Sequence, residues 1–486
     1  MGKDATMQEM LDRAAANLDR RRDLDPLIEA QWRWMIGVND GHLGNHARAV
    51  AFLEKCVALR QRVLGADHAD TLNALNSLGM AYDWAGDYAQ AIRTLEQVRD
   101  QRVAKLGLAH PDTVTTLINE GKAYRGAGRT AEAILLFEQL RAQMDRLPAP
   151  DHPFKLVMLE SLAEAYHNAE RLAEATRLFE EIGDQLVAKL GPDHPETLRT
   201  LAGLALAYQR VGRLPEATKL FEQVRDQRMA RLGSDHSDTL NTLNNLAVAY
   251  WSLSQLDRSV PIFEHVLQQQ EPKLGRKHPS TQLTVANLGV NYKAAGRLSE
   301  ALPLLEEAYH FSKEHPQLHW VGEQLLDGYI RSDQATEAAT LVQELLAELR
   351  QSLPKTSPQL AIELACYGKQ LSQVNAHAAA EPLLRECLAI RRKTQPDAWT
   401  TFNTMSMLGG ALLGQQKYTE AESLLQKGYE GTKARLAAPG ENPHVVAAQK
   451  QRLMEALDRL IELSTAMDKP DEVKKWQAEK EKLGQQ

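Results

Sequence analysis

A single turn position recurs every 42 residues and constrains the fold of this chain more than any other sequence feature. It separates two stretches that are each long enough to form a helix, and it is most often glycine. The regular copies are Gly44, Gly86, Gly128, Glu170, Gly212, Ser254 and Gly296. Less regularly spaced copies are Asp333, Asn375, Gln416 and Asp468. Repetition at this period indicates an array of similar units and not a globular domain.

Each unit is predicted to contain two amphipathic helices. Apolar residues recur at intervals of three and four, as in Leu72, Leu75 and Leu78, which is typical of a helix with one buried face. Small residues recur where two helices must approach closely. They are Gly37, Gly79, Gly121, Ala163, Ala205, Ala247, Gly289, Gly368 and Gly409 in the first helix, and Ala49, Ala91, Ala133, Ala175, Ala217 and Ala301 in the second. Because a unit this short cannot bury both faces alone, we expect the units to stack.

The repeated residues carry a family resemblance. The run Leu78-Gly79-x-x-Tyr82, followed by Gly86 and Ala91, resembles the tetratricopeptide repeat. The 42-residue period and the linkers LGLAHPDT and LGPDHPET are similar to the kinesin-light-chain class of that repeat. The resemblance covers roughly residues 25 to 475. It implies an all-α fold, a right-handed superhelical solenoid of about eleven helix-turn-helix tetratricopeptide hairpins.

A second resemblance is narrower. Residues 380–414 resemble the repeat region that follows the kinase domain in some bacterial serine/threonine kinases, notably of planctomycetes. The sequence itself shows no kinase domain. This resemblance implies a role in bacterial signalling.

Four segments are predicted along the chain. Residues 1–24 are expected to form a capping helix, residues 25–311 the regular 42-residue repeats, residues 312–467 degenerate repeats, and residues 468–486 a charged capping helix. Caps are expected because the terminal units of a stack would otherwise expose an apolar face.

Composition excludes several classes of function. The chain has 57 Lys and Arg against 64 Asp and Glu, a net charge of -7, which favours neither nucleic acid nor an anionic membrane. No apolar run reaches the length of a membrane-spanning helix and no signal peptide is evident, so we expect a soluble, cytoplasmic protein without membrane insertion. Three cysteines argue against a disulfide framework. Cys56 and Cys387 are expected in the core, and Cys366 on the groove side.

No pattern for catalysis, a cofactor or a metal is found. Phosphate-binding loops, zinc motifs and nucleophile elbows are absent from the sequence, so we predict that the chain is not an enzyme and has no cofactor. One histidine recurs before each first helix, in His68, His110, His152, His194, His236, His278 and His315. Successive copies are a whole repeat apart, too far to share a metal ion. We interpret them as packed in the loop and hydrogen-bonded to the start of the next helix.

The resemblance implies that the first helices line a concave surface. Counting from the recurring Tyr, the positions expected to face this surface and bind peptide are Asn73, Asn76, Asn119, Lys122, Arg125, Arg199, Arg210, Asn241, Asn244, Asn245, Trp251, Asn287 and Lys293. Asn amides suit an extended peptide because they donate to C=O and accept from N–H groups. Arg and Lys add attraction for carboxylates. Asn119, Asn245 and Asn287 match the peptide-clamping Asn of the family, whereas Ser77, Ser161 and Gly203 depart from it.

These residues favour one function over two alternatives. Trp251 beside amides and a cation resembles a binding hot spot. We therefore predict a non-enzymatic protein–protein interaction scaffold or adaptor, whose concave groove binds a partner's peptide, with acidic residues in that peptide. The alternative is the regulatory or sensory repeat region of a serine/threonine kinase system. A helical toroid enzyme would need carboxylates on the inner wall, where we expect Asn, Arg and Lys.

Overall fold

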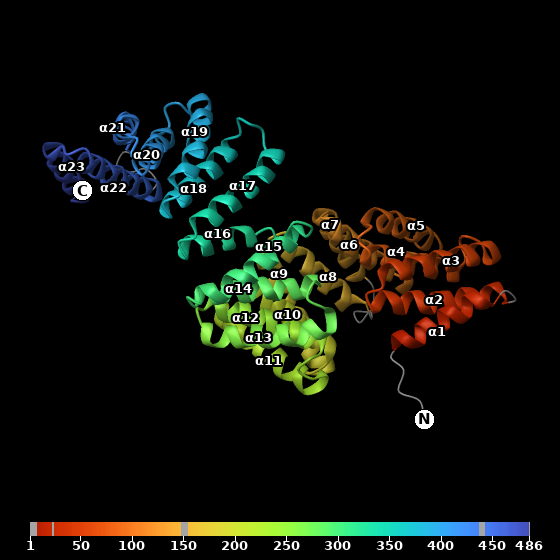
Figure 1. Cartoon of the computed structure of the whole chain (residues 1–486). Helices are drawn as coiled ribbons and strands as arrows, with labels where there is room; N and C mark the ends of the chain where they lie inside the picture. The colour runs from red at the N-terminus through yellow and green to blue at the C-terminus, as the bar shows by residue number, and fades with distance from the viewer. Residues whose placement is uncertain (1–6, 22–23, 147–153, 437–442, 486) are drawn as a thin grey trace. The chain divides into compact units, whose positions relative to one another are not determined.

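The computed structural model describes residues 7–21, 24–146, 154–436 and 443–485. Within these ranges the chain is all-α, with twenty-three α-helices, one short 3₁₀-helix and no strand (Figure 1). The chain divides into two compact units, Met1–Ser254 and Gln255–Gln486. This division differs from the predicted boundary between regular and degenerate repeats, which rests on the regularity of the sequence.

The helices follow one another with short connections. In the first unit they are α1 (Met7–Arg20), α2 (Pro26–His42), α3 (His46–Leu64), α4 (Ala69–Trp84), α5 (Tyr88–Leu106), α6 (Pro111–Gly126), α7 (Thr130–Met144), α8 (Lys155–Asn168), α9 (Leu172–Leu190), α10 (Pro195–Arg210), α11 (Leu214–Leu232) and α12 (Ser237–Ser252). In the second unit they are α13 (Leu256–Leu274), α14 (Pro279–Ala294), α15 (Leu298–Ser312), η1 (Pro316–Leu318), α16 (Val321–Arg331), α17 (Ala335–Ser352), α18 (Pro358–Gln373), α19 (His377–Thr394), α20 (Trp399–Leu413), α21 (Tyr418–Lys433), α22 (Pro443–Ala466) and α23 (Pro470–Gly484).

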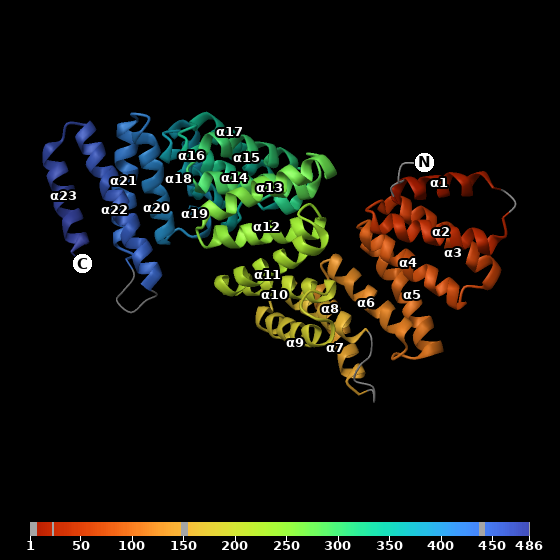
Figure 2. The same ribbon diagram turned by 90° about the horizontal axis from the view of Figure 1, so that it is seen from below.

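After α1, the helices pair in chain order from α2–α3 to α10–α11 in the first unit and from α14–α15 to α22–α23 in the second. These ten pairs, with α12 and α13 as one further helix in each unit, agree with the predicted number of about eleven hairpins. Within the first unit, the pairs from α2–α3 to α10–α11 stack on one another, and within the second unit α18 to α23 lie side by side (Figures 1 and 2). The prediction of an all-α repeat fold is confirmed.

The turn between the two helices of each pair has a left-handed backbone. All the turn positions found from the sequence have positive φ, from 55° at Asp468 to 86° at Gly44. The described non-glycine residues with positive φ are all turn positions of this set: Glu170, Ser254, Asp333, Asn375, Gln416 and Asp468. Glycine is therefore favoured at this turn but not required.

A second set of glycines follows the second helix of several hairpins, which we call the outer helix. Gly107, at the end of α5, has φ 80° and ψ 167°, which lies outside the left-handed helical region. Gly65, Gly191, Gly233 and Gly275 have φ between 86° and 95° with ψ between 155° and 166°. Only glycine enters that region readily, because any Cβ would clash with the backbone. The chain extends there to reach the next first helix, instead of curling into a cap.

The two helices of a hairpin touch where the sequence places small residues. A Cβ at Gly79 would lie 2.6 Å from Leu95 Cγ, and one at Gly121 would lie 2.3 Å from Phe137 Cζ. The recurring alanines of the second helix, from Ala49 to Ala301, have no exposed surface. Bulky residues such as Leu95 and Phe137 are also fully buried. The prediction of close helix approach at these positions is confirmed.

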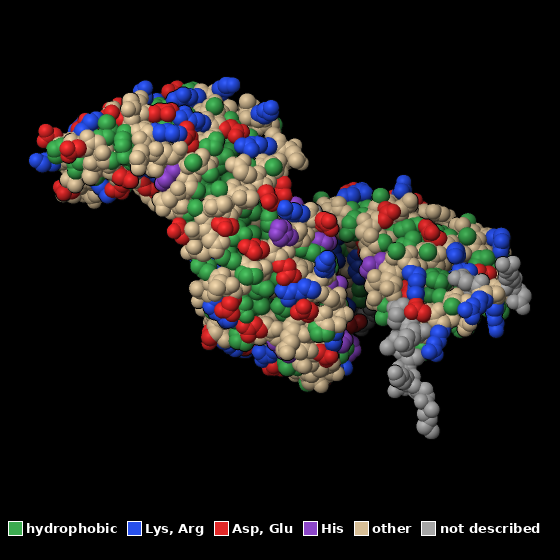
Figure 3. All heavy atoms as spheres, viewed as in Figure 1, with side chains coloured by type: hydrophobic (Ala, Val, Ile, Leu, Met, Phe, Trp, Pro, Cys, Tyr) green, Lys and Arg blue, Asp and Glu red, His purple; other side chains and the backbone are tan. Residues whose placement is uncertain are grey.

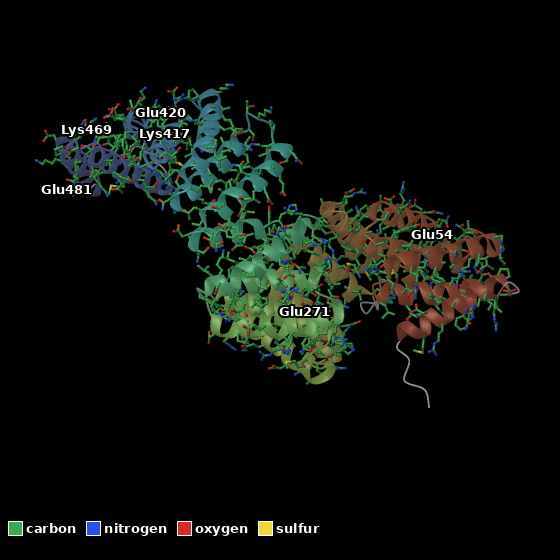
Figure 4. The ribbon with its side chains drawn as sticks, viewed as in Figure 1. Glu54, Glu271, Lys417, Glu420, Lys469 and Glu481 are labelled. Carbon is green, nitrogen blue, oxygen red and sulfur yellow. The ribbon has the colours of Figure 1, made fainter. Side chains whose placement is uncertain are left out.

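Successive hairpins are also joined by a repeated polar contact that sequence analysis missed. In the first helices α4, α6, α8, α10, α12 and α14, the Tyr near the helix end donates a hydrogen bond to a Glu of the preceding outer helix, as Tyr82 does to Glu54 of α3 at 2.8 Å. Glu54 is labelled in Figure 4. The other pairs are Tyr124–Glu96, Tyr166–Glu138, Tyr208–Glu180, Tyr250–Glu222 and Tyr292–Glu264. Burial of the phenol, with this hydrogen bond, raises the pKa of Tyr82 to about 12. Tyr82 therefore stays neutral and donates.

The recurring histidines act at helix starts. The Nδ1 atoms of His68, His110, His236 and His278 accept from the backbone N–H two residues further on at 3.2 Å, and His194 does so at 3.3 Å. These side chains cap the first helices, in the way Ser or Asp does elsewhere. His315 differs, because its ring stacks on Phe311 at 3.9 Å. His152 lies outside the described residues.

Both terminal helices bury apolar side chains. Leu11 and Leu18 of α1 pack with Ile36 and Phe52. In the second unit, Trp476 of α23 is buried and lies edge-on to Tyr429 at 5.6 Å.

Cys56 and Cys387 are buried and Cys366 is exposed, as predicted.

The two glycine positions predict different tolerance to substitution. No atom lies within 4 Å of a Cβ built at Gly107 or Gly128. The cost of a substitution at these two positions therefore differs only through backbone strain. Gly107→Ala should lower the free energy of unfolding by about 1–3 kcal/mol. Gly128→Asn should cost less than about 1 kcal/mol, because Asn tolerates left-handed backbone. Urea denaturation followed by circular dichroism measures both, and equal losses would contradict the assigned conformations.

Candidate functional site: a groove lined by the first helices

The first helices of four consecutive hairpins surround one cavity in the first unit. It has a volume of about 470 Å³ and is lined by residues of α4, α6, α8 and α10, with Tyr88 from the start of α5. We call it the central groove; its lining residues are Asp83, Trp84, Tyr88, Lys122, Arg125, Gly126, Val157, Glu160, Ser161, Glu164, Glu196 and Arg199. Of the predicted binding residues, Lys122, Arg125 and Arg199 lie here together.

Two of these cations are paired with carboxylates that sequence analysis did not expect on the inner wall. Arg125 forms an ion pair with Glu164. Arg199 donates to both carboxylate oxygens of Glu160, from Nε to Oε1 at 2.9 Å and from Nη2 to Oε2. Thr200 also donates to Glu160 Oε1, at 3.1 Å. The expectation of an inner wall without carboxylates was therefore wrong, because each acid lies one hairpin away from the arginine that neutralises it.

Lys122 differs from its two cationic neighbours. No hydrogen bond or ion pair joins its ammonium to another described residue, although Glu164 and Glu160 lie near enough to act on it through space. Burial lowers the pKa of Lys122, and the nearby carboxylates oppose this effect. Of the three cations in the central groove, Lys122 is the one whose hydrogen-bond donors are not used by another residue of the described ranges.

Two aromatic residues of the groove were missed. The ring of Trp84 lies over Gly41, where a Cβ would approach Cζ3 to 2.2 Å. The ring of Tyr88 lies over Gly126, where a Cβ would be 2.5 Å from Cε1. Both rings line the groove and are held by glycines of a neighbouring helix. Gly41 and Gly126 are the sequence feature that could have indicated these rings, because neither glycine belongs to the repeat pattern.

The predicted amides at the start of the array are mostly engaged within the chain. Asn76 and Asn119 are each 8% exposed, and Asn119 Nδ2 donates to Asn76 Oδ1 at 3.4 Å. Asn73 is exposed, but its Oδ1 accepts from Arg102. The contact between Asn119 and Asn76 joins the successive first helices α6 and α4, whereas the contact of Asn73 with Arg102 joins the two helices of one hairpin, α4 and α5.

The remaining predicted residues of the first unit lie on α10 and α12. Arg210 is exposed and paired with Glu170. On α12, Asn241 is exposed, Asn244 and Asn245 are partly buried, and Trp251 is 39% exposed. The Oδ1 of Asn244 is buried without a hydrogen-bond partner in the described residues. This helix therefore presents an exposed indole and amides with remaining hydrogen-bonding capacity.

The second unit contains the last two predicted residues. Asn287 on α14 is partly buried. Lys293 is 6% exposed, donates to the backbone oxygen and to Oε1 of Gln324 at 3.0 Å and 2.9 Å, and lies 2.7 Å from Asp327. Its donors are used by α16, which belongs to the irregular part of the repeat pattern. Lys293 is therefore a structural cation in this chain.

The second unit also has a polar cavity that the sequence did not indicate. It has a volume of about 320 Å³ and lies between α18, α20 and α22. Arg459 crosses it, approaching Gly410 closely and donating to Ser406 Oγ at 3.0 Å. Burial lowers the pKa of Arg459, opposed by Glu455. Elsewhere in this unit, ion pairs join neighbouring outer helices, such as Lys417 to Glu381 at 2.7 Å and Arg385 to Glu420 at 2.7 Å (Figure 4).

One buried carboxyl lies between two predicted residues of α6. Glu120 has no exposed surface and occupies the position that is Leu78, Leu162, Leu204 and Leu246 in other hairpins. Its Oε1 accepts from Arg99, and its Oε2 has no hydrogen-bond partner in the described residues. Burial raises the pKa of Glu120 to about 7, although the charge of Arg99 acts in the opposite direction.

Metal sites and membrane-spanning helices are two further classes of feature to consider. No group of three or more His, Cys, Asp or Glu side chains there is arranged to hold a metal ion. Among the helices in these ranges, none combines the length and apolar character needed to cross a bilayer.

Comparison with known proteins identifies the family. The tetratricopeptide repeat model matches residues 29–102, 78–146, 154–230, 199–271 and 238–314, and a second tetratricopeptide repeat model matches residues 401–436. These matches cover more than half of the chain, which therefore belongs to the tetratricopeptide repeat family. No curated protein matches the chain.

Solved structures with similar repeats include kinesin-light-chain-like proteins. The chain is similar to a putative kinesin light chain with nearly identical repeats from Podosopora anserina, at 29% identity and a TM-score of 0.37 over 41% of this chain and 95% of that one. It is similar to BtubC (BKLC) from P. vanneervenii at 19% identity and a TM-score of 0.40, over 47% and 90% of the two chains. A Rap protein crystallised with competence and sporulation factor matches at 11% identity and a TM-score of 0.46, over 81% and 100%.

Glu120 predicts a pH-dependent stability. Because its folded-state pKa is raised above the ordinary value of 4.5 to about 7, the folded state binds an additional proton between these values. The contribution of Glu120 to stability is complete below pH 4.5 and is lost as pH rises through 7, a change of about 1–3 kcal/mol. Glu120→Leu should raise the free energy of unfolding at pH 8, and Glu120→Gln should remove the pH dependence.

Denaturation at pH 5.5 and pH 8 measures this effect. Asp184→Asn, which changes an exposed acid on α9, is the control and should keep the pH dependence of the wild type. If Glu120→Gln also keeps it, the buried carboxyl is not the titrating group.

Proposed function

We propose that the chain is a non-enzymatic protein–protein interaction scaffold that binds a polypeptide segment of a partner in the central groove. The observation that carries this proposal is the meeting of four first helices around one cavity with charged and aromatic walls. Stacked helical repeats create extended concave surfaces of this kind, and these are the surfaces such repeats use for binding.

The chemistry of the groove suits a polypeptide. Its donors are Lys122 and the exposed side of Arg199, which is 53% exposed. Its acceptors are Glu164, 39% exposed, and Glu196, which is also exposed. A peptide backbone offers both C=O and N–H groups and can satisfy donors and acceptors that alternate along a wall. The rings of Trp84 and Tyr88 add apolar area for a side chain.

The charge of the groove refines the class of peptide. Three cations and four carboxylates line it, and Arg125 and Arg199 are already paired with Glu164 and Glu160. A uniformly acidic segment would meet Asp83 and Glu196 without compensation. We therefore propose a segment of mixed charge, with one carboxylate placed against Lys122 and basic groups facing the acids.

The helix α12 extends the proposed surface within the first unit, because it follows α10 in the stack of first helices. Its exposed Trp251 and its amides, Asn241, Asn244 and Asn245, provide an anchor and backbone-directed hydrogen bonds. Asn287 lies in the second unit and stays a prediction from the sequence.

The carboxylates of the groove are better suited to binding than to catalysis. Acid–base chemistry with two carboxyls needs one that is kept protonated near neutral pH. Glu160 and Glu164 are each paired with an arginine, so both already act as acceptors within the chain. The regulatory role beside a kinase stays a prediction from residues 380–414.

Charge reversal at Lys122 tests the proposal. Tagged wild-type chain should capture a partner from a lysate, quantified by mass spectrometry, and Lys122→Glu should reduce its recovery at least about tenfold, because a buried like charge would face the bound carboxylate. Trp251→Ala should reduce it as well. A peptide from the captured partner is then titrated against each purified, folded variant by fluorescence anisotropy.

The matched control is Lys219→Glu, the same change on an exposed position of the outer helix α11. Recovery by this variant should equal that of the wild type. If Lys122→Glu and Lys219→Glu capture the partner equally well, binding occurs elsewhere on the chain and the central groove is not the site.

A further inference from the structure

The N-terminal end of the repeat stack is incompletely covered. Trp32 of α2 is 47% exposed. The same position in the next four hairpins is occupied by Ala74, Thr116, Met158 and Thr200, each with no exposed surface. In α6 this position contacts the preceding outer helix, since Arg102 of α5 donates to Thr116 Oγ1 at 2.8 Å. A bulky indole thus stands where the fold normally buries a side chain.

The helix α1 covers this end only in part. Its Leu11 and Leu18 are buried against Ile36 and Phe52. Beside them a cavity of about 690 Å³ remains open, with Leu18, Leu24 and Trp32 among its apolar walls. Ile28 and Met35, one turn to either side of Trp32 on α2, are 52% and 41% exposed. A continuous apolar surface of this kind costs free energy in water and marks an interaction site.

Among the described residues, the charged side chains that line this cavity are all basic. They are Arg13, Arg20 and Arg21, and Asn17 lies beside them. None of these three arginines forms an ion pair with another residue in the described ranges. Basic side chains lie over α1 at this edge of the first unit (Figure 3). An apolar floor with unpaired guanidinium groups at its rim offers pairing to carboxylates.

We propose that this surface, lined by Met10, Arg13, Leu18, Arg20, Arg21, Leu24 and Trp32, docks an acidic amphipathic helix of another protein. Apolar side chains of the helix cover Leu18 and Trp32, and its Asp or Glu residues pair with the arginines. The docked helix takes the place that the preceding outer helix has in later hairpins. The surface is separate from the central groove, so the proposal is independent of the function proposed above.

Two features favour a helix over a lipid surface or a second copy of the chain. The site is a hollow between two helices, which a third helix fills by side-chain interdigitation, whereas a bilayer requires a protruding apolar surface. Recognition of an amphipathic helix by an apolar groove with charged edges is a recurring mode of binding. A second copy would bring 57 Lys and Arg residues along with its 64 Asp and Glu, whereas the arginines of this surface favour an acidic partner.

Selection from a library of displayed helices tests the proposal. The library presents 18-residue helices with a fixed apolar stripe and randomised charged positions, selected on the full-length chain. We expect the recovered helices to be enriched in Asp and Glu. Their affinity, measured by fluorescence anisotropy as synthetic peptides, should fall at least about tenfold on Arg20→Glu/Arg21→Glu and on Trp32→Ala.

The control is Arg62→Glu/Arg93→Glu, which makes the same change of charge on exposed positions of α3 and α5 and should bind like the wild type. Recovered helices without acidic enrichment, or with equal affinity for all variants, would overturn the proposal. So would recovery no better than on an unrelated protein. Trp32-dependent binding to phosphatidylserine vesicles, or a Trp32-dependent dimer in sedimentation, with no helix bound, would assign the surface to a lipid or to a second copy instead.

Discussion

The close approach of the two helices in each hairpin is the constraint on which the rest of this structure depends. A glycine or alanine in the first helix faces a Leu or Phe 16 positions later in the second, as Gly79 faces Leu95 and Gly121 faces Phe137. A methyl group at Gly121 would overlap the Phe137 ring, so the side chain of the second helix fills the space that the first leaves open. This contact turns one face of every first helix towards its neighbours in the stack. The central groove exists because several such helices are held in the same orientation.

Polar contacts then fix how one hairpin stacks on the next. Apolar packing alone tolerates small shifts, whereas a buried phenol must meet its acceptor. The repeated Tyr–Glu hydrogen bonds supply this restraint, and arginines add to it by lying over the same rings, as Arg171 does over Tyr166 at 4.3 Å and Arg213 over Tyr208 at 4.0 Å. Polar residues of the inner wall do similar work, since Asn76 bonds to Asn119 and Glu160 to Arg199. A residue can therefore face the groove and still be unavailable to a ligand.

Repetition made the fold predictable and left the site partly hidden. Turn positions, small residues and capping histidines were predictable because each depends on contacts inside one repeat or at its border. The hydrogen-bond and ion-pair partners of the groove side chains were not predictable. They lie about one repeat away, as Glu164 does from Arg125 and Gln324 from Lys293, and their identity does not follow from the side chain that they contact. The position of a side chain follows from the period, but its hydrogen bonds depend on the identity of residues in another unit. For this reason Lys122, Arg125 and Arg199 were expected on the inner surface, whereas the acids that line the central groove with them were missed.

Departures from the repeat are informative where the substituted residue does not suit its surroundings. Asp40 stands at a Tyr position and is fully buried, but Arg48 binds both of its oxygens, at 2.6 Å and 2.7 Å, so the chain has compensated for that change. Glu120 at a Leu position is compensated only in part, since one oxygen has no partner in the described residues. Trp32 is not compensated at all on its exposed side. Local conflicts that a chain retains are expected where function requires them. The uncompensated indole at the end of the stack is therefore better explained by a partner that covers it than by folding of the chain alone.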